Sequence, residues 1–125
     1  MAAQKIEIKV TTSGSSGSAS GSSGAAVPVG AIVRKYYLDF HASAPGTTDT
    51  TIKALGSPAD ETLVTHSNSA TDGWFHPGAQ VDSETAAAVT GAYAPHILHG
   101  GILSVDLAQC DALTDAVTAT FFLEV

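Results

Sequence analysis

Three histidines in the second half of the chain are the residues whose side chains and spacing most resemble those of metal ligands. His96 and His99 are separated by two residues, and His76 is a third candidate ligand. In an extended segment, residues three apart point to opposite faces, which disfavours a shared ion. The neighbouring Gly100 and Gly101 could turn the chain and bring the pair together. We interpret these side chains as loop histidines and expect neither a metal nor another cofactor.

Asp39, His41 and Ser43 carry the side chains of a nucleophilic triad, but their spacing argues against one. They would share one face of a strand at intervals of about 6.5–7 Å, which is too far for the hydrogen bonds of a triad. The sequence contains no G-x-S-x-G, P-loop or H-E-x-x-H motif. The single Cys110 has no basic neighbour in sequence and is expected to be a buried, inert residue. We therefore predict that the protein is not an enzyme.

Trp74 and Phe75 form a short aromatic segment between Gly73 and Pro77. An exposed aromatic ring can stack on a sugar, whereas tryptophan is more often an anchor in a core or an interface. We favour the second interpretation and predict that Trp74 and Phe75 belong to a packing or interface cluster that contacts a partner. Sugar binding is the alternative, and it requires Trp74 to be exposed beside polar loop residues.

The composition excludes several classes of protein. The chain has 125 residues, enough for one domain, and 5 Lys and Arg against 12 Asp and Glu give a net charge of −7. So few basic residues make nucleic acid an improbable partner. No run approaches the roughly 18 apolar residues of a membrane span, and we expect no signal peptide. The acidic residues lack the pattern of a calcium loop, and they serve either solubility or complementarity to a basic partner.

Alternating apolar residues and frequent turn signals predict an all-β domain. The clearest strand is Ala31–His41, whose predicted core face is apolar, with Arg34 as the exception: Ile32, Tyr36, Leu38 and Phe40. Residues 83–89 are the one helical stretch, and further strands are expected over residues 50–55, 62–66, 93–96, 101–107 and 116–125. We predict a single antiparallel β-sandwich or jelly-roll-like domain over Ala25–Val125, with at most one short helix and with a closed barrel as the alternative.

Met1–Gly24 is predicted to form an extended N-terminal arm. Ser13–Gly24 consists of Ser, Gly and one Ala, which is the composition of a flexible tether. Before this tether, apolar residues alternate with charged ones and predict a half-buried strand: Ile6, Ile8 and Val10. The strand either closes the domain's own sheet or adds to the sheet of a neighbouring chain. We favour strand addition, with Ile6, Ile8 and Val10 as the contacts.

Two segments carry a family resemblance. Tyr37–Ile52 reads YLDFHASAPGTTDTTI, and Ala112–Val125 reads ALTDAVTATFFLEV. Together they resemble small virion structural proteins of tailed bacteriophages, and the H-A-S-A-P block is the most specific part. The resemblance covers roughly Gly30–Val125, is patchy between Leu63 and Leu98, and does not include the N-terminal arm. It implies a non-enzymatic β-sandwich protein encoded among head or tail structural genes.

The favoured function is that of a decoration or cement protein on the capsid exterior, made in the cytoplasm of the host bacterium. Its partners would be the major capsid protein and copies of itself, as a trimer or another clustered state. A tail or head–tail accessory protein is the main rival. A host-surface or glycan-binding module that uses Trp74 is a further hypothesis. A metal-dependent enzyme that uses His76, His96 and His99 is the least favoured one.

Overall fold

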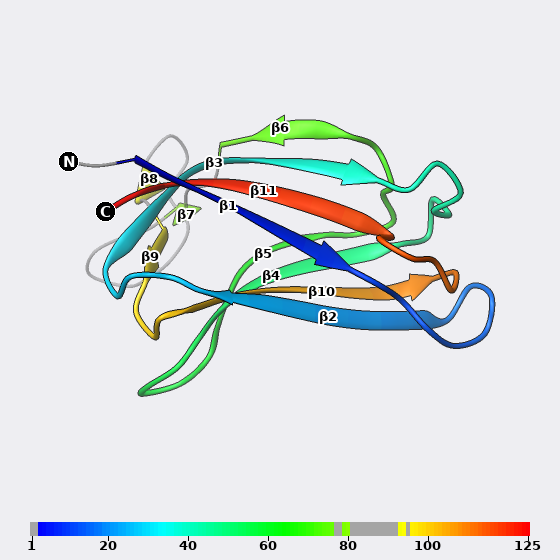
Figure 1. The fold of residues 1–125 in the computed structure, drawn as a ribbon, viewed down its shortest axis with the longest axis horizontal. Helices are drawn as coiled ribbons and strands as arrows, with labels where there is room; N and C mark the ends of the chain where they lie inside the picture. The colour runs from blue at the N-terminus through cyan, green and yellow to red at the C-terminus, as the bar shows by residue number, and fades with distance from the viewer. Residues whose placement is uncertain (1–2, 77–78, 81–92, 95) are drawn as a thin grey trace.

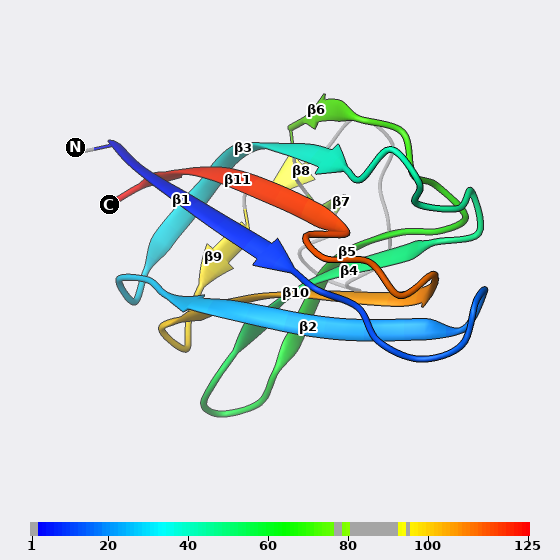
Figure 2. The same cartoon turned by 45° about the vertical axis from the view of Figure 1, so that its right-hand side comes forward.

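Two antiparallel sheets pack against each other in the computed structural model, as predicted for a β-sandwich (Figures 1 and 2). The structure describes residues 3–76, 79–80, 93–94 and 96–125. Within these residues the chain is all-β and contains no helix. The described residues therefore include no helix that is long and apolar enough to cross a membrane. The predicted helical stretch over residues 83–89 lies outside the described residues.

The first sheet has the strand order β1-β11-β3-β6, with β9 also paired to β3. The second sheet has the order β2-β10-β4-β5, and β7 and β8 form a separate pair. The bounds of the strands are β1 Ala3–Val10, β2 Ala19–Ala26, β3 Ala31–Phe40, β4 Asp49–Leu55, β5 Glu61–His66, β6 Gly73–Phe75, β7 Ala79–Gln80, β8 Tyr93–Ala94, β9 His96–Leu98, β10 Ile102–Cys110 and β11 Val117–Glu124.

The apolar face of each long strand points into the space between the two sheets. Alternation in β11 is complete, because every second side chain along this strand is buried. The largest core side chains come from both sheets: Tyr36, Leu38, Ile52, Leu103, Leu107, Phe121 and Leu123. Burial of each such side chain contributes about 1.5–3 kcal/mol to the folded state. The alternation in the sequence therefore located long strands such as β1, β10 and β11 and identified their core faces.

A β-bulge at Arg34 changes which side chains of β3 face the core. The register of β3 against β11 shifts between Phe122 and Leu123, which leaves Arg34 as an extra residue. Residues after the bulge face the core as predicted. Before the bulge, however, the buried side chain is Val33, whereas Ile32 is only half-buried. Arg34 interrupts the predicted apolar face because the register shifts there. The prediction that Ile32 faces the core is therefore wrong.

The strand expected to form a docking arm belongs to the first sheet of its own domain. β1 pairs with β11 along its whole length. Ile8 and Val10 are buried between the sheets, and Ile6 packs against the same core. Their side chains are therefore not available to a neighbouring chain, which corrects the prediction that they are the contacts of an added strand. Closure of the chain's own sheet is the alternative that the structure adopts.

The Ser/Gly tract forms a turn and a strand instead of a flexible tether. In the turn, the Gly17 N–H donates to Asp111 Oδ1 at 2.8 Å. The strand that follows is β2, which pairs with β10 in the second sheet. Small side chains allow this path, because a Cβ atom at Gly21 would lie 2.3 Å from the carbonyl oxygen of Thr11. The tract therefore carries the chain from the first sheet to the second.

Gly21→Ala should lower the free energy of unfolding by about 1–3 kcal/mol, because the backbone at Thr11 must move to admit the methyl group. Ser22→Ala is the matched control, since Ser22 is exposed, and it should change stability by less than about 0.5 kcal/mol. Denaturation in urea measures both values. Equal stability of the two variants would show that this strand is not held against residues 11 and 12.

Candidate functional site

Two neighbouring residues of β6, Trp74 and Phe75, point to opposite sides of the first sheet. β6 pairs with β3, with Trp74 opposite Tyr37 and Phe75 opposite Tyr36. Because side chains alternate along a strand, Trp74 is 52% exposed on the outer face, whereas Phe75 is half-buried between the sheets. The aromatic segment therefore contributes to two separate environments instead of one cluster.

On the inner side, Phe75 lines a cavity of about 230 Å³ between β3 and β5. The Tyr36 hydroxyl and His66 Nε2 share a hydrogen bond of 2.6 Å, and the rings of His66 and Phe75 lie 4.3 Å apart between centroids. The wall thus combines apolar side chains with imidazole and phenol groups: Tyr36, Leu63, Val64, His66, Phe75, His76 and His96. Such a wall can hold a small molecule by apolar contacts and a few hydrogen bonds.

Burial disfavours the charged form of three groups of this cavity. It lowers the pKa of His66 below its ordinary value. It also lowers the pKa of His96, although the nearby Glu61 carboxylate acts in the opposite direction. Burial raises the pKa of Tyr36 far above its ordinary value, so the phenol keeps its proton. These groups therefore offer hydrogen bonds instead of ionic contacts.

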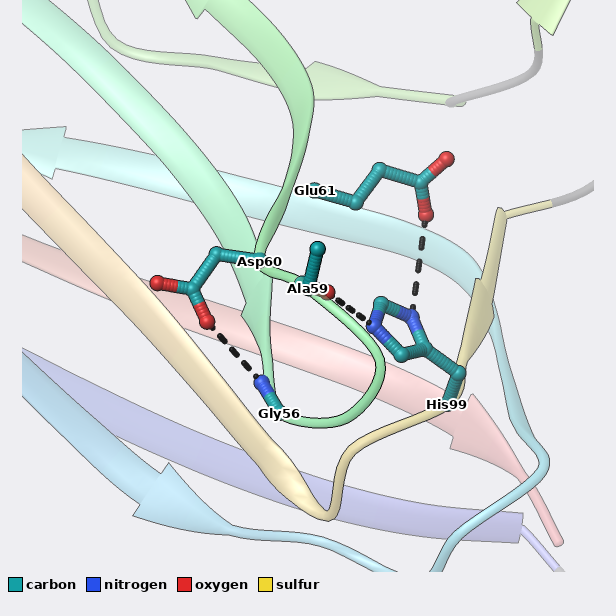
Figure 3. A network of polar contacts seen from close by, with 5 residues as sticks. All are labelled: Gly56, Ala59, Asp60, Glu61 and His99. Atoms are coloured by element: carbon teal, nitrogen blue, oxygen red, sulfur yellow. Dashed lines mark hydrogen bonds and ion pairs between the residues drawn. The ribbon is translucent and has the colours of Figure 1, made fainter.

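The three histidines considered as metal ligands do not converge. His76 and His96 line the cavity. His99 points to the β4–β5 loop, where its Nε2 lies 2.7 Å from the carbonyl oxygen of Ala59 and its Nδ1 lies 3.9 Å from Glu61 Oε1 (Figure 3). Among the described residues, no group of three or more His, Cys, Asp or Glu side chains could hold a metal ion.

The β4–β5 loop that receives His99 is itself closed by a side chain. The Gly56 N–H donates to Asp60 Oδ1 at 3.0 Å across the loop (Figure 3). Gly56 has φ 140°, and a Cβ atom there would lie 2.3 Å from the Cα of Gly100. The two glycines therefore let the loop approach the chain just after His99, and this contact gives His99 a structural role.

Tyr36 and His66 are the cavity residues that carry no signal in the sequence. Tyr36 is one apolar position of a strand, and His66 simply ends another strand. They lie 30 residues apart and meet because β3 and β5 belong to opposite sheets at the same edge of the sandwich. The spacing of residues in a single sequence does not report a contact of this kind.

The remaining residues considered for catalysis have structural surroundings. His41 is exposed, and its Nδ1 accepts a hydrogen bond from the backbone N–H of Ser43 at 3.0 Å, which is the geometry of a turn. Asp39 is exposed on β3. Cys110 is fully buried, as predicted. Asp39, His41 and Ser43 therefore do not assemble into a triad.

On the outer side of the first sheet, Trp74 is the centre of an aromatic cluster. The ring centroids of Tyr37 and Phe122 lie 5.0 and 5.7 Å from that of Trp74. Lys35 Nζ lies 4.7 Å from the centre of the Trp74 ring and 5.3 Å from that of Phe122, within the range of cation–π contacts. We call Lys35, Tyr37, Trp74 and Phe122 the aromatic–lysine patch.

No family model matches this chain, and no curated protein is significantly similar to it. With no relative to compare, the cavity and the aromatic–lysine patch are assessed by the chemistry of their own residues. The cavity has a largely uncharged wall between the sheets, whereas the patch combines the exposed Trp74 with half-buried neighbours and carries a cation over two of its rings. The aromatic residues of the patch are of the types enriched at contact surfaces between proteins, whereas lysine is depleted there.

The stability of the fold should decrease as the pH drops below about 6.5, the ordinary pKa of histidine. Burial lowers the pKa of His66 and His96 in the folded state, so the unfolded chain binds these protons at a higher pH than the folded chain does. The free energy of unfolding, measured by denaturation at about pH 7.5 and about pH 5.5, gives the size of the loss.

His66→Gln should reduce this pH dependence, because it removes one of the two half-buried imidazoles whose pKa is lowered. His76→Gln is the matched control, since His76 is exposed at the same cavity, and it should retain most of the pH dependence. An unchanged pH dependence in His66→Gln would contradict the assignment of the loss to His66.

Proposed function

We propose that this protein is a non-enzymatic structural protein of a tailed-phage virion, which binds the capsid shell from outside and stabilises it. The starting point is the resemblance of Tyr37–Ile52 and Ala112–Val125 to phage virion proteins. What the structure adds in support is the placement of these two segments relative to each other.

The two resembling segments meet at one end of the sandwich, next to the end of β1 (Figure 1). The His41 N–H donates to the carbonyl oxygen of Ala116 at 2.8 Å, and the Ala116 N–H donates to that of Val10 at 2.7 Å. Segments that are distant in sequence and joined in space form one structural motif. This junction is the observation that carries the proposal, because it explains why both segments would be retained together.

Beyond the His41 contact, the H-A-S-A-P-x-T-T-D block is held by hydrogen bonds within itself and to neighbouring loops. Thr48 is fully buried, and its hydroxyl donates to the carbonyl oxygen of Pro45 at 2.7 Å. Asp49 Oδ1 accepts the backbone N–H of Asn68 at 2.9 Å. The polar residues of the block therefore hold a corner of the fold.

A decoration protein needs a rigid body that repeats over a lattice and contacts its neighbours through exposed surface. The sandwich provides such a body, because both N-terminal strands are hydrogen-bonded into its sheets. Weak contacts repeated over a lattice add up through multivalency. The proposed partners are the major capsid protein and further copies of this chain, clustered as a trimer or another oligomer. The proposed location is the capsid exterior, after synthesis in the cytoplasm of the host bacterium.

Two other functions remain alternatives. A tail or head–tail accessory protein would have the same kind of fold and the same family resemblance. A host-surface or glycan-binding module is favoured by one observation, the 52% exposure of Trp74. The neighbours of Trp74 are nevertheless sheet residues with aromatic and lysine side chains, and not the polar loop residues that this hypothesis expects.

Purified virions of the phage that encodes this chain should contain it in a copy number comparable with that of the major capsid protein. Immunogold electron microscopy should place it on the head. Virions that lack it should lose DNA at a lower temperature, and adding the purified protein should restore their resistance. Label confined to the tail, or absence from purified virions, would overturn the proposal.

A further inference from the structure

We infer that the outer face of the first sheet is the docking surface of this protein, and that its occupant is an acidic, partly apolar protein surface of the capsid shell. This inference rests on the proposed function and specifies the contact by its residues and by the chemistry of the partner.

The apolar part of the docking surface is the aromatic–lysine patch. Its three rings come from three adjoining strands, β6, β3 and β11, so the backbone ladder fixes their spacing. Trp74 is 52% exposed, although Tyr37 and Phe122 pack against it. Rings that are already held in place lose little conformational entropy on binding. The patch therefore has the properties of a preorganised anchor at the centre of an interface.

The charge of this face differs from that of the rest of the molecule. It carries four of the chain's five Lys and Arg residues: Lys5, Lys9, Arg34 and Lys35. Among the described residues, three carboxylates share the face, and their charges and those of the four cations sum to slightly positive: Glu7, Asp39 and Glu124. An acidic surface is therefore attracted to this face and repelled by the remainder of the molecule.

The distribution of the cations on the face indicates which of them meet the partner. Arg34 is ion-paired with Glu124. Lys5 and Lys35 occupy the positions opposite Phe122 on its two sides, in β1 and β3. These two ammonium groups therefore flank the aromatic rings, and the matching partner surface has carboxylates around an apolar centre. A second copy presenting the same face would place like charges together, which disfavours that copy as the occupant.

The position of Lys35 also favours a protein over a glycan. Its ammonium group lies over the ring faces of Trp74 and Phe122. Stacking of a sugar requires a free aromatic face, and on this side the faces are taken by the lysine. A carboxylate from a protein partner can instead approach Lys35 from solvent without displacing it, and the ring edges remain available for apolar contact.

The test is binding of the full-length protein to capsid shells stripped of it. Trp74→Ala should weaken binding about 30-fold or more, as for an anchor at the centre of an interface. The double variant Lys5→Gln, Lys35→Gln should also bind more weakly, and its affinity should depend less on salt concentration. All variants should keep the unfolding midpoint of the unchanged protein within a few degrees, because these side chains are on the outer face.

Matched controls lie on the second sheet. Ile102 is another exposed apolar side chain, at 43%, and Lys53 on β4 is the one remaining lysine or arginine. Ile102→Ala and Lys53→Gln should each change shell binding by less than about twofold, since they lie outside the proposed hot spot.

The possible results separate this inference from the proposed function. If the unchanged protein binds shells and the variants of the first sheet bind equally well, the docking surface is wrong while the proposed function stands. If the unchanged protein does not bind shells, the proposed function and this choice of partner are both overturned. If soluble glycans bind the protein and Trp74→Ala abolishes that binding, the face is a sugar site and the protein partner is wrong.

Discussion

The rest of the fold depends on one close approach, where the chain crosses from β1 in the first sheet to β2 in the second. At Gly21 the chain lies so near Thr11 that no side chain fits between them. This approach lets β1 complete the first sheet while β2 completes the second. The turn is tied to the opposite end of the chain, because Asp111 accepts a hydrogen bond from Gly17. The space at this approach therefore requires glycine at position 21.

With that edge of the sandwich occupied by β1 and β2, the cavity and β6 lie at the other edge. There β5 ends the second sheet, and β6 and β9 pair with β3 in the first. The bulge at Arg34 shifts β3 so that Tyr36 points inward to His66, while Lys35 and Tyr37 point outward. One irregularity in one strand therefore helps to build both the cavity and the aromatic–lysine patch.

The two candidate sites have different chemistry because they lie on opposite sides of one sheet. Inside, burial disfavours the charged forms of Tyr36, His66 and His96 and makes the Tyr36–His66 hydrogen bond part of the packing. Outside, water screens the charges, and the exposed rings keep apolar area that a partner can cover. The proposed role in a virion would use the outer side, while the inner side contributes to stability and to its pH dependence.

The sequence by itself determined the all-β class, the positions of the long strands other than β2, and the burial of Cys110. Alternation reports which residues share a face, so Ile8 and Val10 were correctly assigned to the apolar face of a strand. It does not report which strand lies alongside, because backbone hydrogen bonds between strands are the same for every sequence. The proposed strand addition was therefore a choice between neighbours that the residues did not settle.

Only the tertiary structure decided the partners of these strands. It placed β1 beside β11, made β2 from the Ser/Gly tract, joined Tyr36 to His66, and turned Trp74 outward and Phe75 inward. Each of these outcomes is set by contacts between segments that are far apart in the chain. Such contacts depend on how the core packs and on the space that small residues leave. The local pattern of one segment reports neither of these.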